Sequence, residues 1–470
     1  MMDSKTERGG DVLRVKGFDF VERKDRGRDG MRSWRCREYP KNKCPATVKT
    51  MNGIVQEGKG NDRHCHGGDP LLTAAREIQS KMRLKASECM ESTSSIVAEH
   101  LDGVSADIQF RLPKRPSMFD NVRAKRRAVN PVEPNPQNLG FEMPDSFSNI
   151  ILYDSGPDDP SRIIIMGKQE LMNSLEQADL WMGDGTFDVC PQVFYQLYTV
   201  HCKIGNSYPP CVYFLLPSKS QAIYIRALEQ LKILIPQASP DTILVDFEMA
   251  PRNAFHQVFV GVNIKGCLFH HGQSINKKVG EIGLKCEYES NIDFHMAVKS
   301  LLALAFVPED DVLERFQELV EKFEQLVAQY PELARVNELY TYFEVNYIRG
   351  SERPQGRGRA PARYPITMWN HYDDPANNVP RTTNAVEGYH NGLNSLFLAK
   401  HPSVWTLLRG LHKDMALHLK TWVDDQAVNN PAPRLKYALI SVRLATKIAS
   451  YDEAQDKLAY LRAVAHIFSS

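Results

Sequence analysis

The spacing of hydrophobic residues changes along the chain at about residue 148. Beyond that point, short apolar runs alternate with segments in which apolar residues recur every three or four positions. Short apolar runs predict buried strands, and the longer spacing predicts helices with one apolar face. We therefore expect residues 148–400 to form one domain of alternating strands and helices.

The predicted elements of this domain follow a definite order. Two strands (NIILYD, RIIIMG) and a helix (LMNSLEQA) come first, and three closely spaced strands follow (LWMGDGTFDV, FYQLYTVHCKI, PPCVYFLLPS). A helix (QAIYIRALEQLKIL), a strand (TILVDFE), a second helix (APRNAFHQVFV) and a last strand (IKGCLFHHG) complete the series. A meander of three strands followed by helix, strand, helix and strand predicts a mixed α/β sheet with helices packed on it. This order is the one expected of a ribonuclease-H-like domain.

Helical spacing dominates two further parts of the second half. Residues from about 285 to 385 contain FHMAVKSLLALAFV, DDVLERFQELVEKFEQLVAQY and VNELYTYFEVNYI, which predict a helical insertion in the sheet domain. Residues 401–470 are expected to form a C-terminal helical segment.

Residues 70–128 predict a smaller segment that is helical and basic. Two stretches have helical spacing, LLTAAREIQSKMRLKA and STSSIVAEHLDGV, and Ser92, Thr93 or Ser94 is expected to cap the second. A basic helix follows, which suggests a helix-turn-helix-like DNA contact, a nuclear-import signal or a plain solvated helix. Its charged residues are Arg123, Lys125, Arg126 and Arg127. The Pro- and Asn-rich residues 129–147 predict a linker at a domain boundary.

The composition is that of a globular protein, but the charge is unevenly distributed. The chain is 42% hydrophobic and 24% charged, near the averages for folded proteins. No apolar run reaches the roughly 18 residues of a membrane span, and the polar start MMDSKTERGGD does not resemble a signal peptide. We therefore expect an intracellular protein without a membrane partner.

Residues 1–130 hold 27 Lys and Arg against 18 Asp and Glu, whereas the remainder holds 31 against 39. This asymmetry favours a module that binds a polyanion, although ordinary surface charge is the alternative.

Four residues of the basic part have the spacing of a zinc site. Nine cysteines are scattered over the chain, and without a secretion signal they are expected to be reduced thiols or metal ligands. Seven residues separate Cys36 from Cys44, nineteen separate Cys44 from His64, and His66 follows after one more. Two thiolates and two imidazoles make a closed tetrahedral Zn²⁺ site, which stabilises a domain too short to build a large core. The alternative is a chance cluster of surface side chains.

His64 and His66 are expected to approach the same ion. In a strand-like H-x-H sequence both imidazoles point to one face, so Cys65 would point away. The stretch resembles the FLYWCH-type zinc finger in its aromatic residues, its W-x-C element at Trp34 and Cys36, its second cysteine and its closing H-x-H. The resemblance covers residues 12–68 and implies a small zinc-bound β domain that directs DNA binding.

An aspartate lies within one of the predicted strands, in WMGDGTFDV. A lone buried carboxylate is destabilising, so Asp184 requires a cation, a metal ion or a hydrogen-bonding loop. Asp246 ends the strand TILVDFE, and if the two strands are neighbours both carboxylates meet at one edge of the sheet. Hard divalent cations relieve the repulsion between two such carboxylates. Glu387, in RTTNAVEGYHNGLN, is the best candidate for a third acid.

Other assignments remain open for these acids. Asp184 in a G-D-G sequence is compatible with a turn, and Asp246 is compatible with a cap at the end of a strand. Glu248 would share the strand face of Asp246, so it is a rival or auxiliary ligand.

Four segments in this order resemble the Mutator-like element (MULE) transposase domain. They are ADLWMGDGTFDV, ILVDFEMAPRNAF, GCLFHHGQS and NAVEGYHNGLN, and they cover roughly residues 175–400. The resemblance implies that Asp184, Asp246 and Glu387 form a DDE triad. Cys267 and His270 match the C-x-x-H element of the family.

The neighbours of these residues carry weaker expectations. Cys267 and His270 are compatible with a buried core pair, a metal site or a DNA contact, and His271 is an alternative to His270. Tyr389 and His390 are expected to be packing or helix-surface residues.

The resemblance implies metal-dependent cleavage and strand transfer on double-stranded DNA at transposon ends. Asp184 would bridge two Mg²⁺ or Mn²⁺ ions, and Asp246 and Glu387 would each bind one. A nuclear protein that acts as a homo-oligomer on DNA is also implied. The sequence has no GxxxxGK[ST] loop, which argues against an ATP-driven motor. Two other functions fit the same residues: a transposase-derived DNA-binding transcriptional regulator without cutting activity, and a nuclease without strand transfer.

Overall fold

The chain divides into two compact units, Met1–Pro134 and Asn135–Ser470. The computed structural model describes residues 4–5, 11–23, 31–89, 91–129, 134–353, 358–374, 380–397, 400–427 and 435–467. The division falls within the Pro- and Asn-rich stretch 129–147, of which residues 130–133 lie outside the described ranges.

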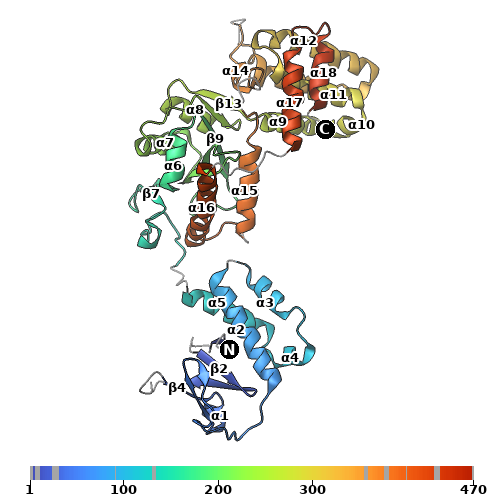
Figure 1. Ribbon diagram of the computed structural model, residues 1–470. Helices are drawn as coiled ribbons and strands as arrows, with labels where there is room; N and C mark the ends of the chain where they lie inside the picture. Colours follow the sequence, from blue (N-terminus) through green and yellow to red (C-terminus); the bar gives the residue numbers. More distant parts are fainter. Residues whose placement is uncertain are drawn as a thin grey trace. The chain divides into compact units, whose positions relative to one another are not determined.

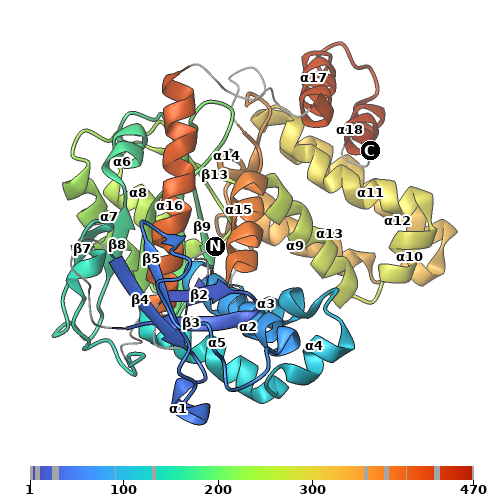
Figure 2. The same ribbon diagram turned by 60° about the horizontal axis from the view of Figure 1, so that its bottom comes forward.

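The first unit begins with a six-stranded antiparallel sheet whose strands are neighbours in sequence order, and Figure 2 shows β2 to β5 side by side. The strands are β1 (Ser4–Lys5), β2 (Asp11–Val15), β3 (Phe18–Glu22), β4 (Met31–Cys36), β5 (Thr47–Met51) and β6 (Ile54–Val55), and the short helix α1 (Tyr39–Asn42) follows β4. Leu13, Phe20 and Trp34 form its core together with Cys36 and Cys44. A core of this size buries little apolar surface, so the sheet depends on additional stabilisation.

Four helices complete the first unit. They are α2 (Pro70–Glu88), α3 (Thr93–Leu101), α4 (Ala106–Arg111) and α5 (Arg115–Val129). Of the three expected caps for α3, the structure uses Ser92, whose hydroxyl accepts a hydrogen bond from the Ser95 N–H at 2.9 Å. Met82, Ile96 and Val122 belong to a core that joins α2, α3 and α5.

Ion pairs join the sheet of the first unit to α2. Asp19 on β3 is buried, and its carboxylate oxygens lie 3.2 Å from Arg14 and 3.5 Å from Arg76 of α2. Arg14 also pairs with Glu77 of α2 at 2.8 Å. Because an unpaired buried carboxylate is strongly destabilising, these contacts hold strand and helix together.

The second unit is built on a seven-stranded mixed sheet with the order β13-β12-β9-β10-β11-β8-β7 (Figure 1). The strands are β7 (Ile151–Asp154), β8 (Ile164–Gly167), β9 (Leu180–Thr186), β10 (Gln196–Cys202), β11 (Pro210–Leu216), β12 (Thr242–Val245) and β13 (Asn263–Gly266). β9, β10 and β11 form an antiparallel meander, and β12 runs parallel to both β9 and β13. The predicted mixed α/β sheet is therefore confirmed, and β9, which holds Asp184, is the neighbour of β12, which ends before Asp246.

Helices cover both faces of this sheet. Trp181 and Ile243 belong to a core shared with α6 (Gln169–Glu176), α7 (Gln221–Leu234) and α8 (Met249–Val258). On the opposite face, Met182 and Leu244 pack against Val386 of α15 (Asn384–Leu396). The buried hydroxyl of Tyr213 on β11 donates to Asp414 of α16 (Val404–Gln426) at 2.9 Å, which fixes a second helix on that face.

The chain between β13 and α15 forms a helical layer, which begins before the expected insertion of residues 285–385. It contains α9 (Leu268–Glu281), α10 (Lys285–Ser290), α11 (Ile292–Ala303), α12 (Val312–Gln329), α13 (Val336–Phe343), a π-helical turn (Glu344–Ile348) and α14 (Ile366–Trp369). The C-terminal helices α17 (Leu435–Ala449) and α18 (Lys457–Ile467) add to the same apolar core. Figures 1 and 2 show α11, α12, α17 and α18 grouped on the side of the second unit away from α7 and β7.

Hydrogen bonds fasten the end of the insertion to β13. The Nε2 of buried His371 lies 3.0 Å from the Gly266 carbonyl oxygen, and the Lys265 ammonium donates to the Asn370 carbonyl oxygen at 2.7 Å. The chain that leaves the helical layer is thereby returned to the sheet directly before α15.

Two local predictions are wrong. The stretch IKGCLFHHG is a strand only as far as Gly266, and Cys267 begins the helix that carries His270. Glu248 does not share a strand face with Asp246, because β12 ends at Val245 and Glu248 is the residue before α8. A turn forms instead, in which the Glu248 N–H donates to Asp246 Oδ1 at 3.0 Å.

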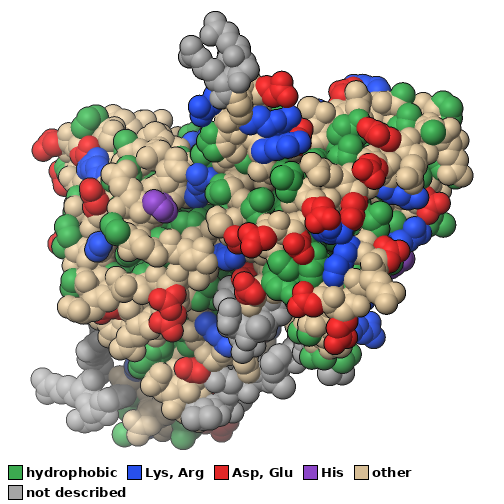
Figure 3. All heavy atoms as spheres, turned by 90° about the horizontal axis from the view of Figure 1, so that it is seen from above, with side chains coloured by type: hydrophobic (Ala, Val, Ile, Leu, Met, Phe, Trp, Pro, Cys, Tyr) green, Lys and Arg blue, Asp and Glu red, His purple; other side chains and the backbone are tan. Residues whose placement is uncertain are grey.

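The described helices and surface add two observations. None of these helices is both long and apolar enough to cross a membrane. On the face of the molecule in Figure 3, the Lys and Arg side chains drawn there are interspersed with Asp and Glu.

The glycine before Asp184 is required by packing. A Cβ at Gly183 would collide with the hydroxyl group of Tyr198 on β10 and would lie 3.4 Å from the Phe255 ring. Both aromatic side chains are buried in the core beneath α7 and α8. Alternation along β9 then directs Asp184 to the opposite face, where α15 lies.

Gly183→Ala is expected to destabilise the second unit by about 1–3 kcal/mol, because the Tyr198 ring must move to admit the methyl group. Urea unfolding followed by tryptophan fluorescence measures this change. Gly280→Ala is the control, since a Cβ there meets nothing within 4 Å. Its effect should be neutral or stabilising by up to about 1 kcal/mol. Equal destabilisation by both variants would contradict the packing argument.

Candidate functional site

The four predicted zinc ligands converge in the first unit. Cys36 ends β4, Cys44 follows α1, and both histidines follow the Thr47–Asn61 bridge. Cys36 Sγ lies 3.2 Å from His66 Nε2, and Cys44 Sγ lies 3.4 Å from His64 Nδ1. One ligand atom from each of the four lies within 4.8 Å of the others. Zn–S and Zn–N bonds of tetrahedral zinc place such atoms about 3.5 Å apart, so the arrangement fits this ion.

The surroundings of these ligands suit zinc as well. The Nδ1–H of His66 donates to the Gly67 carbonyl oxygen at 2.9 Å, which leaves Nε2 to face the metal position. Phe18 stacks on His64 with 3.6 Å between ring centroids. Burial raises the pKa of Cys36 to about 11, and the neighbouring Cys44 sulfur adds to this shift. A divalent cation removes that penalty because it stabilises both thiolates.

The H-x-H segment differs from the sequence prediction in its backbone. Residues 62–68 are not a strand. His64 and His66 nevertheless both turn toward the cysteine sulfurs, while the exposed Cys65 thiol donates to the Asn42 carbonyl oxygen at 3.4 Å.

The acid cluster, Asp184, Asp246 and Glu387, occupies one face of the sheet in the second unit. In the register of β9 with β12, Leu244 pairs with Met182, and the same register carried two residues further aligns Asp246 with Asp184. Glu387 lies in the first turn of α15, directly after the Val386 that packs on Met182 and Leu244. The structure therefore brings the three acids toward one edge of the sheet.

Charge crowding is evident at two of these acids. Burial raises the pKa of Asp246 to about 6, and the nearby carboxylates of Glu248 and Asp184 add to the shift. Burial also raises the pKa of Glu387, again with a contribution from Asp184. A bound cation would offset this repulsion.

His390, expected to be a packing or surface residue, contacts the acid cluster. Its Nδ1 lies 3.2 Å from Asp184 Oδ2, and its Nε2 lies 3.0 Å from Thr199 Oγ1. The E-x-x-H spacing on α15 is the sequence signal for this contact, since residues three apart share a helix face.

A chain of contacts behind Asp184 holds His390 in place. Burial lowers the pKa of His201 to about 3, so its ring is neutral, and its Nδ1–H donates to the Tyr208 carbonyl oxygen at 2.9 Å. The Thr199 hydroxyl oxygen lies 2.9 Å from His201 Nε2 and 3.3 Å from the Asp184 carbonyl oxygen. Since His390 contacts both Thr199 and the Asp184 carboxylate, its ring is fixed between them.

Cys267, His270 and Glu387 form a second cluster, in which one ligand atom from each lies within 4.8 Å of the others. His270 Nε2 lies 3.5 Å from Glu387 Oε1. Burial lowers the pKa of His270, but the Cys267 sulfur and the carboxylates of Asp184 and Glu387 raise it to about 9. Within the described residues, only this cluster and the four zinc ligands are so compact. Neither of these two compact sets includes Asp184 or Asp246.

His271 and Tyr389 lie elsewhere. His271 is fully buried in the helical layer, with 4.5 Å between the centroids of its ring and that of Tyr347, so it does not substitute for His270. The Tyr389 hydroxyl donates to Asp414 of α16 at 2.8 Å.

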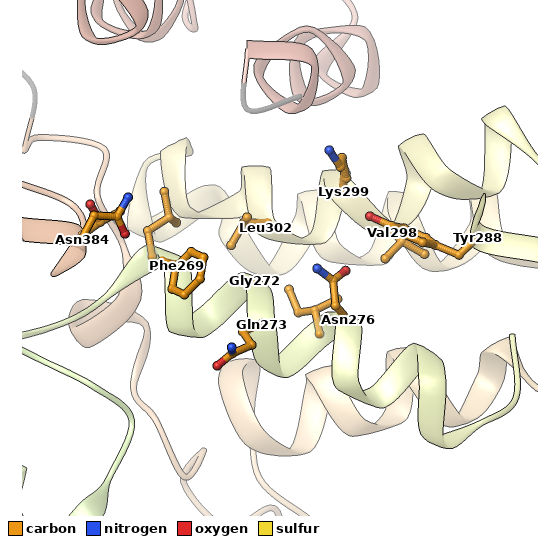
Figure 4. A pocket seen from close by; sticks show the side chains of 12 residues that line it. Phe269, Gly272, Gln273, Asn276, Tyr288, Val298, Lys299, Leu302 and Asn384 are labelled. Carbon is orange, nitrogen blue, oxygen red and sulfur yellow. The ribbon is translucent and has the colours of Figure 1, made fainter. Parts of the chain in front are cut away.

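A cavity of about 470 Å³ lies between α9 and α11 (Figure 4). Phe269, Gln273 and Asn276 of α9 line one side, and Leu302 of α11 lines the other. Asn384 lies at one end of the cavity, one turn before Glu387 on α15, and Phe269 directly precedes His270. The three acids are not among the residues that line it.

Two known protein families match parts of this chain. Residues 4–66 match the FLYWCH zinc finger domain, and residues 180–274 match the MULE transposase domain. No match to the chain was found among curated proteins. The resemblances expected from the sequence are thus confirmed, and together they indicate a transposase-like DNA-binding protein with a structural zinc site. Asp184, Asp246, Cys267 and His270 lie inside the second match, whereas Glu387 lies beyond it.

Cys36→Ser is expected to remove the zinc of the finger and to unfold its sheet, because metal binding stabilises a core this small. Metal analysis of the full chain should show one zinc fewer, and hydrogen exchange should show loss of protection in β2 to β5. Cys65→Ser is a matched control, since that thiol is exposed and points to Asn42. Retention of zinc by Cys36→Ser, or equal loss in the control, would disprove the ligand assignment.

Proposed function

We propose that this chain is a DNA transposase of Mutator-like type, which cleaves phosphodiester bonds and transfers strands with Mg²⁺ or Mn²⁺. One observation carries the proposal: β9, which holds Asp184, pairs in parallel with β12, which ends directly before Asp246. Val386, the residue before Glu387 on α15, packs against Met182 and Leu244 of the same two strands. Three acids from distant parts of the chain have no structural reason to share one edge of a sheet, because their mutual repulsion is destabilising without a cation.

The strand order supports a ribonuclease-H-like fold for this domain. Three antiparallel strands follow one another as β9, β10 and β11, and β12 and β13 then extend the sheet in parallel on the other side of β9. This is the order that the sequence pattern predicts for such a fold. The helical layer is an insertion between the second and third acids.

We assign one role to each residue of the site. Asp184, Asp246 and Glu387 would hold two divalent ions. When bound, such ions activate the attacking oxygen and stabilise the leaving oxygen. His390 holds the Asp184 carboxylate through its 3.2 Å contact, and the Thr199 hydroxyl holds the His390 ring. His390 is therefore a positioning residue.

DNA binding is assigned mainly to the first unit. α3, α4 and α5 follow one another with short connections, which is compatible with a helix-turn-helix-like contact. Arg123 and Arg127 are exposed on α5 and suit phosphate contacts. Arg126 has a structural role instead, because its guanidinium donates to the Cys89 carbonyl oxygen at 3.3 Å.

The remaining parts of the proposal rest on the family resemblance alone. They are action at transposon ends, assembly as a homo-oligomer on DNA and location in the nucleus.

Asp184→Asn is expected to abolish Mg²⁺-dependent cleavage of duplex DNA taken from the genomic sequence that flanks the gene, because the amide is a poor ligand for a hard cation. DNA affinity should be retained. Asp188→Asn is the matched control, since Asp188 lies four positions further on, is partly exposed and pairs with Lys400 at 3.0 Å. Gel assays of cleaved and joined products provide the measurement.

The products distinguish the alternatives. Cleavage with strand joining supports a transposase, and cleavage without joining supports a nuclease. Binding without any cleavage by the wild-type chain would indicate the DNA-binding regulator instead. Equal loss of cleavage in both variants would remove the assignment of Asp184.

Replacing Arg123 and Arg127 with Ala is expected to weaken DNA binding mainly at low salt. Each lost phosphate contact should reduce the slope of log K against log salt by about 0.9. Lys81→Ala on α2 is the control, because Lys81 pairs with Glu77 at 3.2 Å. Titrations at several salt concentrations measure both variants. An unchanged slope in the double variant would show that α5 does not contact the phosphates.

A further inference from the structure

The start of α9 holds a sulfur atom in a defined, buried environment. Cys267 is fully buried, and both the backbone N–H and the hydroxyl of Thr383 donate to its Sγ at 3.2 Å. Burial opposes the thiolate, but the His270 imidazole and these two donors favour it and lower the pKa of Cys267. The Leu268 N–H donates to the Arg381 carbonyl oxygen at 2.8 Å, so the segment before α15 is fixed against the start of α9.

Two buried polar atoms of this cluster have no hydrogen-bond partner. His270 Nδ1 and Glu387 Oε1 form no hydrogen bond within the described part of the chain, although His270 Nε2 lies 3.5 Å from the same Glu387 oxygen. Buried polar atoms without partners are rare in folded proteins and call for a specific explanation. A metal ion is one explanation, because the carboxylate and one nitrogen of the imidazole can both bind it.

The distances and the types of donor fit a transition metal. Tetrahedral zinc places nitrogen and oxygen ligands about 3.4 Å apart, and sulfur and nitrogen ligands about 3.6 Å apart. The His270 to Glu387 contact measures 3.5 Å, and one ligand atom from each of the three residues lies within 4.8 Å of the others. A thiolate, an imidazole and a carboxylate together favour zinc over magnesium, which prefers oxygen ligands only.

We propose that Cys267, His270 and Glu387 form a second zinc site, separate from that of the finger. Three protein ligands leave a fourth position for a water molecule or an oxygen of another ligand, unlike the closed site of the finger. Thr383 acts on the sulfur as an outer-sphere donor. Zinc binding at this site does not require that the chain cleaves DNA. If the proposed function also holds, zinc bound here withdraws Glu387 from the acid cluster and inhibits Mg²⁺-dependent cleavage.

Metal content of the full chain tests the site without DNA. After equilibration with zinc and removal of the excess, wild type should hold two zinc ions per chain, one for each cluster. Cys267→Ser and Glu387→Gln should each hold one. Cys286→Ser is the control, because that exposed thiol lies on α10 outside both clusters, and it should hold two.

Cobalt substitution identifies the ligand. The near-ultraviolet absorption from sulfur to Co²⁺ should fall by about a third in Cys267→Ser, since three thiolates would bind metal in wild type. The same absorption should also fall in Glu387→Gln, because loss of the carboxylate releases the ion bound by Cys267. An unchanged absorption in Glu387→Gln would show that the carboxylate is not a ligand. One zinc in wild type, or two in both ligand variants, would overturn the proposal. Because Glu387 is only partly buried, Glu387→Gln keeps the test valid if Cys267→Ser does not fold.

Measurements of DNA cleavage and of metal content test the proposed function and the second zinc site separately. A chain that binds two zinc ions but never cuts DNA would disprove the proposed function and leave the site intact. A chain that cuts DNA with one zinc would do the reverse.

Discussion

Repulsion between two carboxylates at the same level of adjacent parallel strands is the constraint on which the second unit depends. β9 holds Asp184, and its parallel neighbour β12 ends directly before Asp246. Burial raises the pKa of Asp246 to about 6, and the carboxylates of Glu248 and Asp184 add to the shift. His270 offsets part of this negative charge, since its pKa is raised to about 9 and it lies beside Glu387, while His390 contacts Asp184. The site is therefore assembled from side chains whose charges balance only when all the segments are in place.

The imidazoles of His390 and His270 differ in whether a ring nitrogen remains without a hydrogen-bond partner. His390 uses both ring nitrogens, one toward Asp184 and one toward Thr199, so it orients the acid and is not available as a metal ligand. His270 has an unpartnered Nδ1 in the described structure and shares a compact cluster with a thiolate. Glu387 thus belongs to two sets of side chains. One is the acid cluster, with oxygen atoms only, and the other combines the sulfur of Cys267, the imidazole of His270 and the Glu387 carboxylate.

The first unit meets a different constraint, which is shortage of apolar core. Its sheet is stabilised by the four ligands of the finger and, beside Cys36, by the ion pairs around Asp19. Because Arg76 of α2 belongs to those ion pairs, the order of the finger is coupled to that of the basic helices. Metal binding and the presentation of α5 are in this way properties of one folded unit.

Local pattern in the sequence was sufficient for much of this description. Alternating and helical spacing predicted the strands β7 to β12, helices between residues 285 and 385, and the helix α3, which Ser92 caps. Cysteine and histidine spacing predicted the finger ligands, and the order of four family-like segments picked out the three acids. These features are set by residues close together in the chain, where periodicity and spacing carry the information.

Contacts between distant segments decided the rest. The sequence placed His390 among packing residues, since nothing local shows that α15 faces β9 and β10; only the folded sheet brings it to Asp184 and Thr199. The sequence pattern also predicted a strand that continues through Cys267, but β13 ends at Gly266. It predicted that Glu248 shares a strand face with Asp246, but β12 ends at Val245. A short apolar run specifies that a strand exists, but where it ends and what its neighbours touch depend on long-range packing and hydrogen bonding, which override local preference.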